Sequence, residues 1–185
     1  NKGLIGVIVN NQLDEYSTDF SGVGVTYKFL NALTEDELVH YMDLVAIGNV
    51  ADSMELNGYE IRYVVNKGLK NINNELIKEF MIDSKLEGSL TPTDVSFNIS
   101  NKINAVIRYG SVEEKTDLFR ALIEEKEEIE YTPRKSKTNP NPTTEKQTLQ
   151  KTIIRLSKNI KQKQDNAEKK CVEKCKEFIQ ENNLN

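Results

Sequence analysis

The run from Asp43 to Leu56 constrains the fold of this chain more than any other segment. It reads DLVAIGNVADSMEL and is apolar on almost every side, yet it carries two aspartates, Asp43 and Asp52. A carboxylate placed in such a run must be paired, hydrogen-bonded or metal-bound, because a buried unpartnered charge is costly. Two interpretations of Asp52 are open. It caps or ends a helix in the core, or it binds a ligand that its short neighbours allow to approach.

The first part of the chain predicts one short strand followed by helices. Leu4–Val9 is a continuous apolar run rich in β-branched residues, which is typical of a buried strand. Ser21 is a suitable N-cap for a helix, and Thr34 for the next one. That second helix is expected to end near Asp52, with a break near Gly48.

Further helices follow a turn predicted at Asn57-Gly58. They are indicated by apolar residues at helical spacing within 61–72, 76–81, 95–107 after Pro92, and 118–123, the last continuing into the acidic run 124–130. The expected fold class is therefore mainly α with a short β element.

The charge distribution divides the chain into an acidic body and a basic arm. Residues 1–130 hold 12 Lys/Arg and 23 Asp/Glu, whereas residues 131–185 hold 13 and 6. Residues 131–144 are basic and contain three of the four prolines, which predicts a linker without fixed structure. Residues 145–185 lack Gly and Pro and predict one long connector helix with a thin apolar stripe.

The basic arm has two interpretations, which the sequence leaves open. Its Lys and Arg residues would attract the phosphate backbone of nucleic acid. Alternatively, it is a solvated helix that packs against the acidic body. A purely structural coiled coil is a weaker possibility, because the stripe is thin and the chain carries a predicted strand.

Composition restricts the class of protein further. No apolar run approaches the ~18 residues of a membrane span, so no membrane partner is expected. Cys171 and Cys175 lie four residues apart, but no second Cys/His pair completes a zinc site. Free thiols in a reducing cytoplasm are therefore expected. His40, the one histidine, has no neighbour in sequence that would make it a catalytic base.

Four blocks of sequence, in order, resemble motifs of one enzyme family. Asp43–Leu56 resembles the motif LDLVALGTIADVVPL, and Ser21–Phe29 resembles SGVGVAFKL. Asn57–Leu69 resembles GENRILVKEGL, and Lys102–Gly110 resembles RINAAGRMG. These are motifs of the DHH phosphoesterases of the RecJ type, the exonucleases specific for single-stranded DNA. The resemblance covers roughly residues 4–123.

The resemblance implies a phosphoesterase that uses Mn or Mg to hydrolyse phosphodiester bonds in single-stranded DNA. Asp52 falls on the motif aspartate that helps to hold the catalytic metals. Asn104 and Arg108 lie four residues apart, so on a helix they point the same way and would position a substrate phosphate. Alternatively, Arg108 bridges acidic groups between helices. Around these two residues the chain departs from the small residues usual in the family.

The family's Asp-His-His triplet is absent, because His40 is followed by Tyr41. We therefore expect a piece of a longer protein, without the N-terminal catalytic part and the C-terminal substrate-binding domain. A two-metal site needs several converging ligands. With Asp52 as a single ligand and no complete catalytic set, the piece is expected to be inactive and to hold no metal stably by itself.

Two alternatives to this interpretation remain open at the level of function. The parent protein could be a DHH phosphodiesterase that acts on small nucleotides such as a cyclic dinucleotide. The chain could instead be a helical module that binds nucleic acid or protein without catalysis. An Asp-His-His triplet upstream of Asn1 would favour an enzyme, and its absence there would favour the binding module.

Overall fold

The computed structural model describes residues 9–11, 19–34, 38–133 and 140–181. They form two compact units, which divide between Ser100 and Asn101. The described residues are mainly helical, with one two-stranded antiparallel sheet. The predicted fold class is therefore confirmed. The predicted strand Leu4–Val9 lies outside the described residues except for Val9, which is exposed and belongs to no helix or strand.

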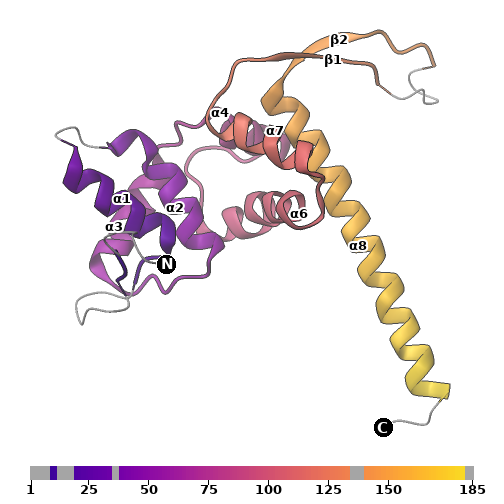
Figure 1. The fold of residues 1–185 in the computed structure, drawn as a ribbon, viewed down its shortest axis with the longest axis horizontal. Coiled ribbons are helices and arrows are strands. Elements are labelled where there is room, and N and C mark those ends of the chain that lie inside the picture. The colour runs from indigo at the N-terminus through magenta and orange to yellow at the C-terminus, as the bar shows by residue number, and fades with distance from the viewer. Residues whose placement is uncertain (1–8, 12–18, 35–37, 134–139, 182–185) are drawn as a thin grey trace, which may run out of the picture. The chain divides into compact units, whose positions relative to one another are not determined.

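The first unit is a cluster of helices (Figure 1). Its elements are α1 (Gly22–Leu33), the 3-10 helix η1 (Leu38–Tyr41), α2 (Met42–Ala51), α3 (Tyr59–Lys70), α4 (Glu75–Asp83), α5 (Pro92–Asp94) and the π-helical turn η2 (Val95–Ser100). The helices predicted after Ser21 and within 61–72 and 76–81 are confirmed, whereas the single helix predicted from Thr34 to near Asp52 is the 3-10 helix η1 followed by α2. Thr34 follows α1 as its C-cap, and residues 35–37, predicted as the first turn of the next helix, lie outside the described residues.

α2 is the central helix of this unit, which explains why its sequence is apolar on almost every side. It packs against α3, α1 and η2, and its Met42, Val45, Ala46, Ile47 and Val50 are buried. Gly68, in the last turn of α3, lies against the carbonyl oxygen of Met42, the first residue of α2. α2 and α3 are therefore an antiparallel pair in close contact.

The predicted break of this helix at Gly48 is wrong. The N–H of Asp52 donates to the carbonyl of Gly48 at 3.0 Å, so the helical hydrogen bonds continue through the glycine. A side chain at Gly48 would meet Val23 of α1. The glycine thus permits close packing of α1 on α2, and that packing offsets the low helix propensity of glycine, a cost of about 1 kcal/mol.

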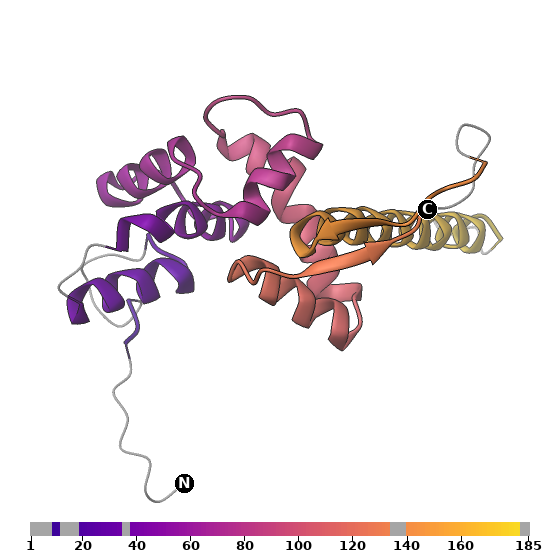
Figure 2. The same cartoon turned by 90° about the horizontal axis from the view of Figure 1, so that it is seen from above.

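The second unit contains α6 (Asn101–Tyr109), α7 (Val112–Leu122), β1 (Glu128–Tyr131), β2 (Glu145–Thr148) and α8 (Leu149–Glu181). α6 and α7 pack against the first turns of α8 (Figure 1). The buried side chains of these three helices include Ala105, Val106, Leu118, Ala121, Leu149 and Ile153. β1 and β2 lie side by side next to the start of α8 (Figure 2).

The acidic run 124–130 does not continue the helix before it, contrary to expectation. α7 ends at Leu122, and Glu124 adopts a left-handed conformation with φ 61°. Residues 128–131 then pair with 145–148, with Tyr131 opposite Glu145. The Arg155 guanidinium lies 3.3 Å from the centroid of the Tyr131 ring. This contact with α8 favours the strand, because a cation over a ring is attractive.

The segment predicted as a linker connects these two strands. Its residues 132–133 and 140–144 belong to no helix or strand, and residues 134–139 lie outside the described ones. The long helix begins at Leu149, four residues later than the predicted 145. The division into a body over 1–130, a linker over 131–144 and a connector over 145–185 stays a prediction.

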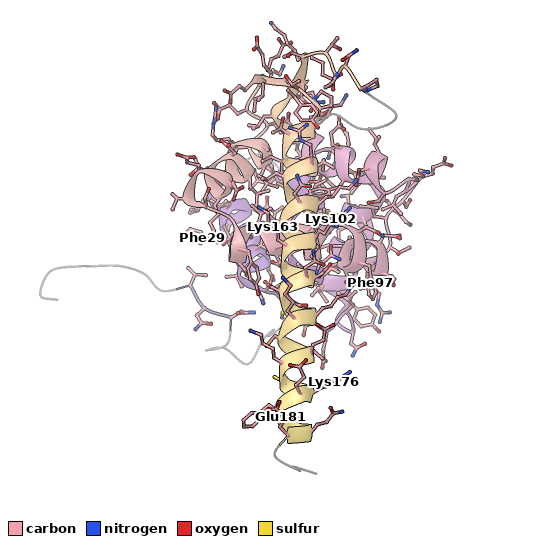
Figure 3. The ribbon with its side chains drawn as sticks, turned by 90° about the vertical axis from the view of Figure 1, so that its right-hand side faces the viewer. Phe29, Phe97, Lys102, Lys163, Lys176 and Glu181 are labelled. Carbon is pink, nitrogen blue, oxygen red and sulfur yellow. The ribbon has the colours of Figure 1, made fainter. Side chains whose placement is uncertain are left out.

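Only the first third of α8 packs against the rest of its unit. Its buried residues all lie between Leu149 and Ile160, and every residue from Asn166 to Glu181 is exposed. Figure 3 shows Lys163, Lys176 and Glu181 along this helix. Cys171 and Cys175 are free and exposed on it. None of the helices in the described part combines the length and the apolar composition of a membrane span.

Arg120 connects the end of α7 to the segment before β1 through ion pairs. Its Nε and Nη2 donate to the two carboxylate oxygens of Glu125 at 2.8 and 2.9 Å, and Nη2 also donates to Glu127 at 2.6 Å. The hydrogen bond from Arg120 lowers the pKa of Glu125 below its usual value, and the bond to Glu125 raises the pKa of Arg120. Both side chains are partly exposed, so water weakens the interaction.

We expect this contact to make the unit more sensitive to acid. A carboxyl whose pKa is lowered by folding contributes stability above its unfolded pKa of about 4.3 and loses that contribution as pH falls through the folded value. In Arg120→Gln, the fall in stability below about pH 4.5 should therefore be shallower than in the wild type. Urea unfolding between pH 3 and 7 measures this difference. Arg155→Gln is the control, because Arg155 contacts Gln147 and Tyr131 and no ion pair of Arg155 is found among the described residues. Parallel curves for Arg120→Gln and wild type would contradict the prediction.

Candidate functional site

The carboxylate of Asp43 is buried and engaged in the fold. Its side chain is 1% exposed. Oδ1 accepts a hydrogen bond from the N–H of Leu44, and Oδ2 accepts from the N–H groups of Asn73 and Asn74, all three at 2.8 Å. The side chain of Asn74 in turn caps α4. Asp43 therefore joins the first turn of α2 to the start of α4, and this satisfies its charge without a metal.

Asn49 is a second buried polar residue of α2, and sequence analysis did not single it out. Its Oδ1 accepts from the N–H of Ser21 at 2.9 Å, and its Nδ2 donates to the carbonyl of Val45 at 2.8 Å. Asn49 thus positions the start of α1. The sequence did contain a signal for this role, because Asn49 is an amide side chain within an apolar run. Ser21 is the N-cap of α1, as predicted, but its side chain makes no capping hydrogen bond.

Asp52 lies at the end of α2 with its side chain exposed to solvent. It is the C-cap, and Ser53 after it turns the chain with φ 55°. Among the described residues, no hydrogen bond or ion pair to its carboxylate is found. A helix C-terminus carries partial negative charge, which adds to that of the carboxylate and attracts cations. Of the two aspartates in the run, Asp52 is therefore the one that a cation can reach.

The described residues around Asp52 do not complete a metal site. Nowhere in the described ranges do three His, Cys, Asp or Glu residues gather as metal ligands. Glu55 is exposed three residues further along the chain. A pair of divalent ions requires more converging ligands than one carboxylate supplies. Asp52 can thus be one ligand of a metal centre, and no chemical step follows from the described residues alone.

Asn104 and Arg108 lie one turn apart on α6, as predicted. Asn104 is half-buried and Arg108 is exposed, while Ala105 and Val106 between them are buried. Arg108 forms no ion pair within the described part of the chain, so the predicted alternative of a bridge to acidic groups is not seen there. Asp52 belongs to the first unit and these two residues belong to the second. Their role in binding phosphate stays a prediction.

No family model matches the chain. It is similar to two curated proteins with the provisional name single-strand DNA-specific exonuclease YorK. One comes from the SPbeta prophage of Bacillus subtilis (strain 168) and the other from Bacillus phage SPbeta. Each is 36% identical over 166 residues, which cover 85% of this chain and 28% of the relative's length. The chain is therefore related to one part of these proteins, and the predicted resemblance to single-strand-specific exonucleases is confirmed.

Proposed function

We propose that this chain is part of a divalent-metal-dependent phosphoesterase of the RecJ-like DHH type that hydrolyses single-stranded DNA. The single observation that carries the proposal is the contrast between the two aspartates of α2. Asp43 is buried and fully hydrogen-bonded, whereas Asp52 is exposed and unpartnered in the described part. The names of the two relatives support the class of substrate.

In this proposal Asp52 supplies one ligand of the metal site. Carboxylate oxygens suit hard divalent ions such as Mg and Mn. The remaining ligands come from residues outside the described ranges. Asn104 and Arg108 hold a phosphate of the substrate, because a guanidinium forms strong charge-assisted hydrogen bonds with phosphate oxygens.

The test uses the full-length protein with labelled single-stranded and duplex DNA in the presence of Mn. We expect the single strand to be degraded, the duplex to resist, and EDTA to stop the reaction. An intact single strand would contradict the proposed substrate. A cyclic dinucleotide is assayed in parallel. Its hydrolysis without degradation of DNA would favour the small-nucleotide alternative, and binding without any hydrolysis would favour a binding module.

The 185-residue chain alone is expected to have no nuclease activity with Mn, because the described residues offer one metal ligand where several are needed. The assay is the same as for the full-length protein, at equal molar concentration. Chelator-sensitive degradation of single-stranded DNA by the isolated chain would show that a complete site lies within it.

A further inference from the structure

The outward face of α3 combines aromatic and cationic side chains. Residues three and four apart on a helix share one face, and along α3 these are Tyr59, Arg62, Tyr63, Lys67 and Lys70, which we call the α3 outer face. The opposite face is buried against the core through Ile61, Val64, Val65 and Leu69. The packing of α3 on α2 therefore fixes the direction in which the outer face points.

The two tyrosines of this face are unusually exposed. Tyr59 is 94% exposed and Tyr63 is 57% exposed, although each ring carries a large apolar surface. Lys67 Nζ donates to the hydroxyl of Tyr63 at 3.0 Å and lies 5.3 Å from the centroid of its ring. A positive charge is thus held beside an aromatic face that solvent can reach. Rings presented in this way are suitable for stacking with another planar group.

The charge of this face is opposite to that of the unit that carries it. Residues 1–100 hold 7 Lys/Arg and 15 Asp/Glu, and three of those seven cations lie on the α3 outer face. Glu60, the acidic residue of α3, forms an ion pair with Lys28 of α1 at 2.8 Å. A cationic patch within an acidic body attracts a polyanion locally.

The α3 outer face begins at the end of the helix pair where Asp52 lies. Because α2 and α3 are antiparallel, the first turn of α3 stands near the last turn of α2. Arg62 strengthens this connection, since its guanidinium donates to the carbonyls of Leu56 and Asn57 at 3.3 and 3.4 Å. The aromatic face and the candidate metal ligand are therefore held on one rigid hairpin of helices.

We propose that the α3 outer face binds single-stranded nucleic acid, with bases stacked on Tyr59 and Tyr63 and phosphates attracted by Lys67 and Lys70. Aromatic rings interleaved with cations are how proteins bind single strands without reading sequence. The two rings lie one turn apart, about 6 Å along the axis. That spacing exceeds the 3.4 Å rise per base in a stacked strand, so the bound bases separate from each other. The choice of DNA as the strand rests on the proposed function, whereas the binding surface stands on the geometry of α3.

The first experiment uses tryptophan as a reporter of stacking. The 185-residue chain contains none, and the signal of each introduced tryptophan is the difference between the variant and the unmodified full-length protein, titrated in the same way. Tyr59→Trp and Tyr63→Trp are made in the full-length protein and titrated with oligo-dT in EDTA, which prevents degradation. Stacked bases should quench both tryptophans. Phe119→Trp is the matched control, because Phe119 is 61% exposed on α7 in the other unit, and its fluorescence should change little.

A second experiment measures affinity by fluorescence anisotropy of labelled oligo-dT. Tyr59→Ala and Tyr63→Ala should each weaken binding by about tenfold, whereas Tyr59→Phe, Tyr63→Phe and the control Phe119→Ala should bind like wild type. Lys70→Gln should lower the slope of log affinity against log salt by about 1. Both tyrosines are exposed, so these variants should fold normally.

The outcomes separate this inference from the proposed function. Quenching of both reporters without any degradation of DNA by the same protein in Mn would support the surface and contradict the phosphoesterase. Degradation of DNA with unquenched reporters and unchanged affinities would overturn the surface and leave the enzyme. Absence of oligo-dT binding by the full-length protein would also overturn the surface.

Discussion

Replacing Asp43 by alanine should lower the free energy of unfolding by about 3–5 kcal/mol. The carboxylate accepts three backbone hydrogen bonds in a buried position, from Leu44, Asn73 and Asn74. Its removal leaves these donors without a protein acceptor, and each buried unsatisfied donor costs about 1–3 kcal/mol. Domains have total stabilities of about 5–15 kcal/mol. The expected loss is therefore a large fraction of the stability of a typical domain.

Urea unfolding followed by circular dichroism measures this loss, with Asp43→Asn and Asp52→Ala as companions. Asp43→Asn should lose less stability than Asp43→Ala, because the amide oxygen of asparagine still accepts a hydrogen bond. It should still be less stable than wild type, because the NH₂ group cannot accept from the remaining N–H donors. Asp52→Ala removes a carboxylate from the same helix, but an exposed one, and should stay within about 0.5 kcal/mol of wild type. If Asp43→Ala were equally mild, the hydrogen bonds of Asp43 would not support the fold as described.

Asp52→Ala should reduce degradation of single-stranded DNA by the full-length protein at least about 100-fold. Loss of a residue that only orients a metal ligand typically costs about 10–100-fold, and loss of a ligand should cost more. The fold should remain intact, because the side chain makes no contact that α2 needs. A slight gain in stability is expected, since a negative charge at a helix C-terminus is unfavourable.

Two measurements establish the role of Asp52. Initial rates with Mn give the loss of activity, and electron paramagnetic resonance of Mn gives the loss of binding independently of turnover. Glu55→Ala is the matched control, since Glu55 is an exposed carboxylate three residues away, and it should retain both. Asp52→Ala with wild-type rates and wild-type Mn binding would make Asp52 an ordinary surface carboxylate.

The helices were predictable because their signals are local. Apolar spacing along the chain locates α3 and α4, the N-cap Ser21 marks the start of α1, and Pro92 marks the first turn of α5. The break assigned to Gly48 failed because the residue that makes a glycine favourable there, Val23, lies on another helix. Helix propensity considers Gly48 alone, whereas the close packing of Val23 makes glycine favourable at this position of the helix.

The hairpin of β1 and β2 was missed for a similar reason. Thirteen residues separate Tyr131 from Glu145, its partner in the ladder, and the acidic composition of 124–130 favours a helix over a strand. Tyr131 is placed by Arg155, which lies more than twenty residues further along the chain. A strand that is stabilised by a contact so distant in sequence shows only a weak pattern in its own residues.

The roles of Asp43 and Asp52 also required the structure. In the sequence both are carboxylates within one apolar run, nine positions apart. The donors that occupy Asp43 are the N–H groups of Asn73 and Asn74, about thirty residues away. The sequence resemblance indicated Asp52 as the metal ligand. The hydrogen bonds of Asp43 show that Asp43 stabilises the fold instead.

The exposed part of α8 is a helical spacer whose length sets the distance between the packed start of the helix and its far end. From Asn166 to Glu181 each residue is exposed, and the buried residues through which the helix packs all precede this segment. Its sixteen residues span about 24 Å at 1.5 Å per residue. Seven inserted residues would add about 10 Å while rotating the far end by only about 20°. Four would add about 6 Å and rotate it by about 40°. Length and orientation of this segment can therefore be tuned almost separately, without disturbing the packed turns that begin the helix.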